Sequence, residues 1–170
     1  MQRRAIYLAV GVTVIGTLWY LFRPELLFLN KTVDEKLPGT DGTAPSVSGA
    51  EPVVLSSGSF QGLAHETKGA ATIHRLPDGT RILRLTEFET SNGPDVRVYL
   101  VAAPDAKDDE TVRRDGFIDL GSMKGNRGSQ NYGVPPDADL SKYQSVSIWC
   151  RRFGVNFGAA SLVPRQPKAG

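Results

Sequence analysis

Short runs of alternating apolar and polar residues dominate the chain from residue 53 to residue 163. In the clearest run, at 96–101, Val96, Val98 and Leu100 fall on one face and predict a half-buried strand. Glycine- and proline-rich turns separate further predicted strands, at 53–60, 69–76, 81–88, 117–120, 128–134, 145–150 and 155–162. This spacing predicts an all-β fold, an antiparallel β-sandwich or barrel-like domain.

Three segments between these runs carry local signals of their own. Pro77-Asp78-Gly79 predicts a tight turn between two strands. The polar segment 105–115 fits either a surface loop or a short helix. The segment 137–143 predicts one helical turn, capped by Asp137.

A long apolar run precedes the predicted strands. Residues 5–22 carry no charge and follow Arg3 and Arg4. As a helix they would span roughly 27 Å, close to the hydrocarbon core of a bilayer. We therefore predict a cytoplasmic N-terminus at 1–4, a transmembrane signal-anchor helix at 5–22, and an extracytoplasmic location for the rest. A cleaved signal peptide is the alternative, although no small-residue cleavage site follows closely.

The remaining segments complete the predicted domain organisation. From residue 30 to residue 52 the chain is rich in proline, glycine, threonine and serine and has no apolar periodicity, so we predict a flexible linker at 23–52. The β domain occupies 53–163, and the last residues, 164–170, are expected to be disordered.

Composition excludes several classes of function. The net charge is only +2, so we expect no nucleic-acid partner. The chain has one cysteine, which rules out an intramolecular disulfide, a cysteine-clustered zinc site and the two-cysteine attachment of c-type haem. It carries none of the common hydrolase motifs and only two histidines, so a hydrolytic enzyme is disfavoured.

The single cysteine, Cys150, lies in the predicted strand 145–150. In strand phase it shares a face with Val146 and Ile148, whereas Trp149 falls on the opposite face. That phase predicts a buried thiol that packs as a small hydrophobe. The alternative is a redox thiolate or cofactor ligand, which needs a bound metal or a neighbouring group that lowers its pKa.

Two turns hold the other candidate ligands. His65, in the turn 62–69, could bind a metal or haem through its imidazole, or serve as a structural histidine. Asn92 and Asp95, in Asn92-Gly93-Pro94-Asp95, could offer oxygen ligands to Ca²⁺, or simply build a rigid turn. The sequence names no metal.

Several stretches together resemble the DM-thirteen domain, which also occurs in Skeletor-type proteins. They are Gly58-Ser59-Phe60, His65, Gly69, the segment 87–100 with its Gly93-Pro94-Asp95, the segment 121–135, and Ile148-Trp149-Cys150 followed by Phe153. The resemblance covers the whole predicted domain, 53–163. It implies an all-β domain outside the cytoplasm with an electron-transfer role.

The resemblance also implies where that role would lie. The family's proposed redox centre is a cysteine, acting as a thiol or holding a prosthetic group such as haem. By position this role falls on Cys150, with His65 as a candidate partner and Trp149, Asn92 and Asp95 as supporting residues. The electron partner would be a separate protein, because no second redox domain accompanies this one.

A non-enzymatic module for ligand binding or adhesion is the rival hypothesis. Its surface would be formed by the loops 62–68, 91–95 and 124–130, and Cys150 would be structural. A cleft shared by Cys150 and His65 favours the redox hypothesis. A sulfur buried in apolar surroundings, with the three loops gathered at one end, favours the rival.

Overall fold

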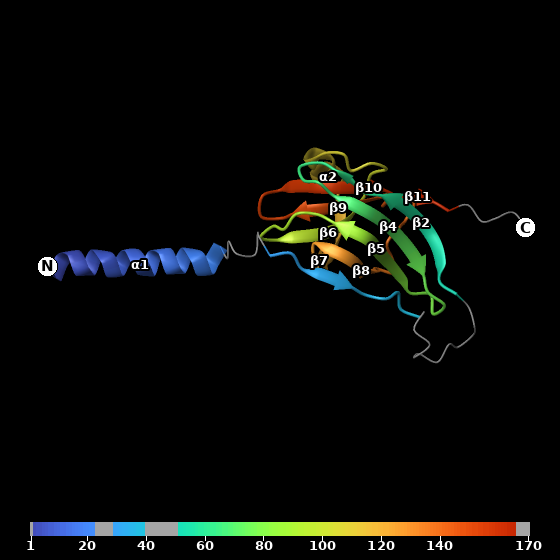
Figure 1. Cartoon of the computed structure of the whole chain (residues 1–170). Coiled ribbons are helices and arrows are strands. Elements are labelled where there is room, and N and C mark those ends of the chain that lie inside the picture. The colour runs from blue at the N-terminus through green and yellow to red at the C-terminus, as the bar shows by residue number, and fades with distance from the viewer. Residues whose placement is uncertain (1, 23–28, 40–50, 166–170) are drawn as a thin grey trace, which may run out of the picture.

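Two β-sheets packed face to face make up the domain in the computed structural model, which describes residues 2–22, 29–39 and 51–165 (Figure 1). The first sheet has the strand order β1 (Thr32–Asp34), β8 (Arg127–Val134), β5 (Arg81–Glu89), β4 (Lys68–Arg75), β2 (Val53–Ser59), β11 (Val163–Pro164). The second has the order β3 (Gln61–Gly62), β10 (Val155–Ser161), β9 (Ser145–Cys150), β6 (Val96–Val101), β7 (Phe117–Ser122). Neither sheet closes on itself, so the predicted all-β fold is confirmed as a sandwich and not as a barrel.

The inner faces of the two sheets form the hydrophobic core. Leu83 and Leu85 of β5 meet Val98 and Leu100 of β6, and all four are completely buried, as is Ile148 of β9. Each burial of this kind contributes about 1.5–3 kcal/mol to folding. The inward phase predicted for the strand at 96–101 is therefore correct.

A short helix covers part of the outer face of the second sheet. The helix α2 (Asp109–Asp115) begins after Asp108, whose carboxylate accepts a hydrogen bond from the amide of Thr111 at 2.7 Å. The open choice for 105–115 is thus resolved as a loop followed by a capped helix. The turn at 77–79 is also confirmed, because the amides of Gly79 and Leu76 bond to the carbonyls of Leu76 and Thr80 respectively.

The predicted helical turn at 137–143 is present in part, because the amides of Lys142 and Tyr143 donate to the carbonyl of Asp139 at 3.0 and 2.9 Å and close a single turn. Its cap is corrected: Asp139, not Asp137, begins the turn, and no longer helix follows. The carboxylate of Asp139 accepts hydrogen bonds from the amide and the hydroxyl of Ser141. The turn does not extend into a helix because β9 begins at Ser145, two residues after Tyr143.

The predicted N-terminal helix is present as α1 (Gln2–Phe22), and its described apolar side chains, such as Ile6, Ile15 and Trp19, are exposed. Its predicted role as a transmembrane signal-anchor is not supported. Among the residues that the structure describes, no helix is both long and apolar enough to cross a membrane. The extracytoplasmic location of the domain stays a prediction from the sequence.

Part of the predicted linker forms an edge strand. Residues 32–34, within the range 23–52, are strand β1, which pairs in parallel with β8. The next residue, Glu35, receives hydrogen bonds from Lys124 Nζ at 2.7 Å and from the amide of Asn131 at 2.7 Å, and its own amide donates to Ser129 O. The described part of this segment, 29–39, is therefore docked on the domain. The parts at 23–28 and 40–50 lie outside the described residues.

The first two residues of the predicted disordered tail are ordered on the first sheet. Pro164, the first residue of the predicted disordered tail, belongs to β11 and pairs with Ser56 of β2. The amide of Arg165 donates to Leu55 O at 2.9 Å. The rest of the predicted tail, 166–170, lies outside the described residues.

Replacing Gly128 by alanine is expected to weaken the pairing of strand β1 with β8. Gly128 has φ +95°, and a Cβ there would lie far inside van der Waals contact of the carbonyl of Val33. Strain of this kind costs about 1–3 kcal/mol. Hydrogen exchange should show the Glu35 amide losing protection. Gly133→Ala is the matched control, because it lies on the same strand and a Cβ there meets nothing within 4 Å. Equal protection in both variants would contradict the expectation.

Candidate functional site

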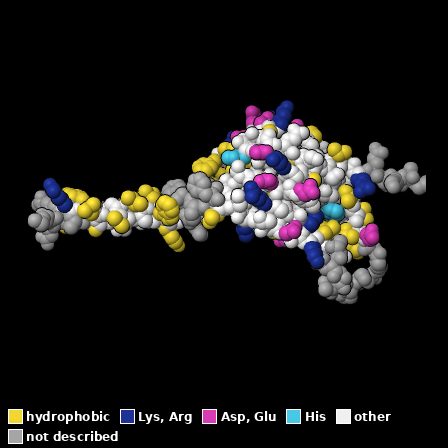
Figure 2. Space-filling model, viewed as in Figure 1, with side chains coloured by type: hydrophobic (Ala, Val, Ile, Leu, Met, Phe, Trp, Pro, Cys, Tyr) yellow, Lys and Arg dark blue, Asp and Glu magenta, His cyan; other side chains and the backbone are white. Residues whose placement is uncertain are grey.

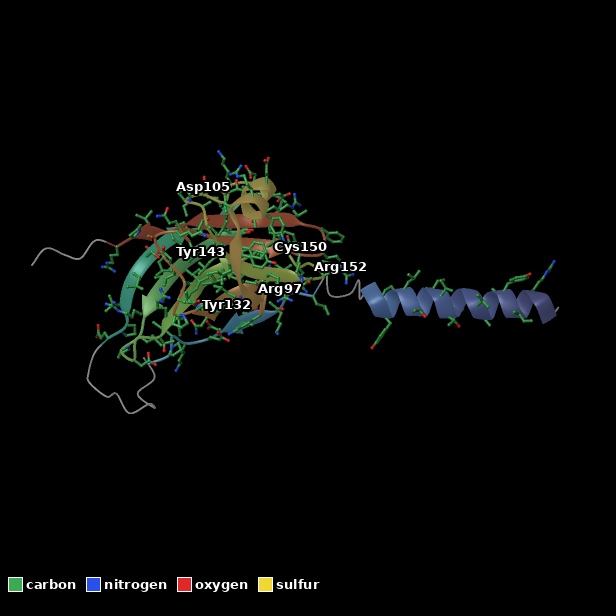
Figure 3. The ribbon with its side chains drawn as sticks, turned by 180° about the vertical axis from the view of Figure 1, so that it is seen from behind. Arg97, Asp105, Tyr132, Tyr143, Cys150 and Arg152 are labelled. Atoms are coloured by element: carbon green, nitrogen blue, oxygen red, sulfur yellow. The ribbon has the colours of Figure 1, made fainter. Side chains whose placement is uncertain are left out.

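Cys150, the last residue of β9, faces the core between the sheets. Its predicted phase is correct: Val146, Ile148 and Cys150 are each 0% exposed in the inter-sheet core, whereas Trp149 joins an apolar cluster on the outer face. Figure 3 shows Cys150 inside the sandwich, with Arg152 projecting beyond it at the end of the domain. Val96 and Val155 are its strand neighbours on either side. The sulfur is thus sealed from solvent.

The segment that begins with Gly93-Pro94-Asp95 lies directly beside the cysteine strand. The amide of Arg151 donates to the carbonyl of Asp95 at 2.8 Å. The carboxylate of Asp95 then bridges two guanidinium groups, those of Arg97 at 2.9 Å and Arg151 at 2.7 Å. These bonds fix the end of β9 against the start of β6, next to Cys150.

This ion-pair cluster keeps Asp95 charged. Partial burial alone would raise the pKa of the carboxyl, but hydrogen bonds from Arg97 and Arg151 lower the pKa below its usual value. The carboxylate is therefore ionised at neutral pH. Both of its oxygens are already occupied by arginine, which leaves Asp95 suited to holding strands together.

Asn92 and Asp95, predicted as joint ligands, have separate partners. The side-chain amide of Asn92 donates to the carbonyl of Leu29 at 2.7 Å and so holds the segment before β1. Asp95 instead holds β9. In the described ranges no group of three or more histidine, cysteine, aspartate or glutamate residues is arranged to bind a metal.

His65 lies on the outside of the sandwich, against Phe157. The two rings are 3.9 Å apart between centroids at an angle of 47°, and the amide of His65 donates to the carbonyl of Phe157 at 3.2 Å. Phe157 is only 4% exposed and packs into the core. Its ring also contacts the position of Gly93, where a Cβ would lie 3.1 Å from its Cζ. His65 therefore packs against a core side chain from outside.

A polar cleft of about 250 Å³ lies at one end of the first sheet. It is lined by Asn30, Glu66, Lys68, Glu89, Thr90, Ser91, Asn92 and Arg127. The loops 62–68, 91–95 and 124–130 each contribute to it, so the three predicted loops do gather at one place. We call this the end cleft. Neither Cys150 nor His65 lines it.

Opposite charges alternate around the end cleft. Glu66 pairs with Lys68 at 2.6 Å, and Glu89 pairs with Arg127 at 2.9 Å. Figure 2 shows the same mixture of acidic and basic side chains across this face of the domain. The lining is therefore charge-balanced. A second cleft, of about 290 Å³, includes Leu63, Asp105 and Val163 in its walls, and again neither Cys150 nor His65.

Buried polar side chains support the floor of the end cleft. The hydroxyls of Thr67 and Thr90 are 2.9 Å apart. Asn126, 2% exposed, donates from its amide to Thr90 O and to Asn30 Oδ1, and accepts from the amide of Lys31. The sequence places Thr67 and Asn126 in the predicted loops 62–68 and 124–130 but gives no sign that their side chains are buried. Their only sequence signal is the position of polar residues beside glycines at strand ends.

The residues present do not fit a haem group. Cavities that bury a drug-sized ligand generally enclose about 300–1,000 Å³, and the two clefts described above, at about 250 and 290 Å³, are too small for a group as large as haem. The sulfur of Cys150 is 0% exposed, and His65 stacks on Phe157. A haem held by both residues would require the core to open.

Comparison with known protein families identifies one that matches most of the domain. The family model described as Electron transfer DM13 matches residues 59–162, from the end of β2 to just beyond β10. No curated protein and no solved structure matches the chain. The matched segment contains Cys150, His65 and the turn 92–95, whereas β1 lies outside it.

Proposed function

Because the chain belongs to the family of electron transfer DM13 domains, we propose that its β-sandwich has a redox role centred on Cys150. One structural observation supports this choice of centre. The two stretches that carry the family resemblance most specifically, around Asp95 and around Trp149-Cys150, meet at the cysteine through the Asp95–Arg151 contacts. These contacts thus fix the strand that carries the only thiol of the chain.

Burial determines how such a centre would exchange electrons. Thiol–disulfide exchange requires direct attack on the sulfur, and Cys150 is 0% exposed. Electrons would instead pass through the surrounding protein to a partner at the surface. That partner would be a separate protein, and it would not need to touch the sulfur.

Voltammetry of the full-length chain tests this proposal. The wild type should give a redox response, at potentials below those that oxidise tyrosine and tryptophan, that Cys150→Ala and Cys150→Ser lose. Val146→Ala is the matched control, because it truncates a side chain equally buried on the same face of β9 and leaves the sulfur in place. Circular dichroism would establish that each variant is folded. An unchanged response in a folded Cys150→Ala variant would refute Cys150 as the centre.

The end cleft supports a second candidate function, non-enzymatic ligand binding. The observation that favours it is the convergence of three loops on one cleft, together with the burial of Cys150. Amide NMR titration with free amino acids and monosaccharides as probes would test this candidate. Binding there should shift the resonances of Ser91 and Arg127. Their failure to shift with any of these probes would count against it.

A further inference from the structure

A row of aromatic side chains crosses the outer face of the second sheet, on the side of β9 away from Cys150. The rings of Phe117 and Tyr99 are stacked, with centroids 4.0 Å apart and planes inclined by only 4°. The ring of Trp149 follows at 6.3 Å from Tyr99, inclined by 25°. We call these three residues the outer aromatic row. It runs from β7 through β6 to β9.

One end of the outer aromatic row is exposed to solvent, and its other two rings are buried. Phe117 is 43% exposed, whereas Tyr99 is 2% and Trp149 5% exposed. The inner two residues pack with Val101, Ala103, Ala106, Val112 and Ala159 in a cluster separate from the inter-sheet core. Stacked rings in van der Waals contact are electronically coupled. An electron leaving Tyr99 therefore has to cross only the ring of Phe117 to reach the surface.

The charges around the row distinguish its two oxidisable rings. The guanidinium of Arg113 lies 5.4 Å from the centre of the Trp149 ring and so opposes the formation of a positive charge there. Tyr99 lies opposite Asp119 on the neighbouring strand. The negative charges of Asp119 and Asp95 both raise the pKa of its phenol. The positive charges of Arg97 and Arg151 lower the pKa of Tyr99, and both guanidinium groups are paired with Asp95. Of the two oxidisable rings, Tyr99 is the one that stacks directly on the exposed Phe117, whereas a cation lies over Trp149.

The phenol of Tyr99 carries its proton before oxidation, so its oxidation to a neutral radical must also release that proton. Burial and the negative charge of Asp119 raise the pKa of Tyr99 above its usual value, so the hydroxyl keeps its proton at neutral pH. Loss of one electron makes a phenol strongly acidic. Asp119 is paired with Tyr99 across β6 and β7, and its carboxylate already accepts from the amide of Gly121 at 2.8 Å and pairs with Arg97 at 3.5 Å; we assign this acidic group as the acceptor of that proton.

We propose that Tyr99 is a second redox site, which gives one electron to a one-electron oxidant that contacts the exposed ring of Phe117. Tyr99 becomes a neutral tyrosyl radical, the oxidant takes up the electron, and the phenolic proton leaves through Asp119. A one-electron reductant of the ascorbate class, with one proton, restores the tyrosine. The inference rests on the redox function proposed above, and it supplies an exposed point of electron exchange in a domain whose cysteine is sealed.

Flash oxidation by a photogenerated ruthenium(III) tris-bipyridine complex tests this inference. The experiment uses the full-length chain with Trp19→Phe, Tyr7→Phe and Tyr20→Phe, which remove the exposed oxidisable rings of α1. Transient absorption should show a tyrosyl radical. Tyr99→Phe, which keeps the stacked ring and removes only the hydroxyl, should abolish most of this signal. Phe117→Leu should slow its formation.

A second tyrosine variant serves as the control for Tyr99→Phe. Tyr143→Phe removes another partly buried tyrosine hydroxyl, away from the row, and should leave the signal intact. Persistence of the signal in Tyr99→Phe, or its loss in Tyr143→Phe, would overturn the inference. Voltammetry of Cys150→Ala separates the two proposals. If the response depends on Cys150 while Tyr99→Phe leaves the radical unchanged, only the role of Tyr99 fails.

Discussion

Replacing Ile148 by alanine is expected to lower the free energy of unfolding by about 2–5 kcal/mol. Ile148 is 0% exposed and faces the inter-sheet core, two residues before Cys150. Its strand neighbours are Val98 of β6 and Gly158 of β10. Strands on both sides hold β9 in place, so the sheet cannot collapse into the space that the lost carbons leave. Denaturant unfolding followed by tryptophan fluorescence measures the change.

Two comparisons make the Ile148 result specific to burial. Ile148→Val removes one carbon and should cost only about 0.5–1.5 kcal/mol. Val53→Ala shortens a side chain that is 49% exposed on β2, and should change stability by less than about 0.5 kcal/mol. If Ile148→Ala cost no more than Val53→Ala, the placement of β9 at the centre of the core would be wrong.

The alternating patterns predicted the inner layer well because strand periodicity reports which face is buried. At 96–101 and 145–150 the residues predicted to face inward do form the core. The same patterns could not reveal that the outer face of β9 is also buried. The cover comes from α2 and the loop before it, whose Ala106 and Val112 pack with Trp149. Polar residues surround these two, so the segment carries no apolar pattern of its own.

The docking of 29–39 could not be predicted from composition. Strand β1 has only three residues, and its neighbours are the polar and glycine-rich residues typical of a linker. Contacts distant in sequence hold it, such as the hydrogen bond between the Lys31 amide and Asn126, 95 residues apart. A local sequence pattern contains no information about such a partner.

The sequence identified the family and the burial of the cysteine, but not the geometry of the candidate site. The family resemblance made His65 a candidate partner for Cys150, yet its ring stacks on Phe157, and neither residue lines a described cleft. Trp149 was singled out for its place beside the cysteine. Its stacking with Tyr99 depends on strand register, which places residues of β6 and β9 diagonally across the sheet.

Gln130 is the residue for which we expect the other large effect. It is 0% exposed, and its side chain bonds to three backbone groups of the loop that precedes β8 and to one hydroxyl of β8 itself. Its Oε1 accepts from the amides of Lys124 and Gly125, each at 3.2 Å, and from the hydroxyl of Tyr132 at 2.7 Å. Its Nε2 donates to the carbonyl of Gly125 at 2.7 Å. Burial raises the pKa of Tyr132 to about 12, so its hydroxyl remains a donor.

Gln130→Leu should lower the free energy of unfolding by about 2–4 kcal/mol, because each buried polar group left without a partner costs about 1–3 kcal/mol. The loop that it holds carries Lys124 and Asn126, which bind Glu35 and Lys31. Hydrogen exchange should therefore show the Glu35 amide opening together with the loss of stability. Tyr132→Phe is the control, because it removes one hydroxyl from the same network and should cost about 1 kcal/mol. If Gln130→Leu left both stability and Glu35 protection unchanged, the hydrogen bonds of Gln130 would not be responsible for ordering the loop and strand β1.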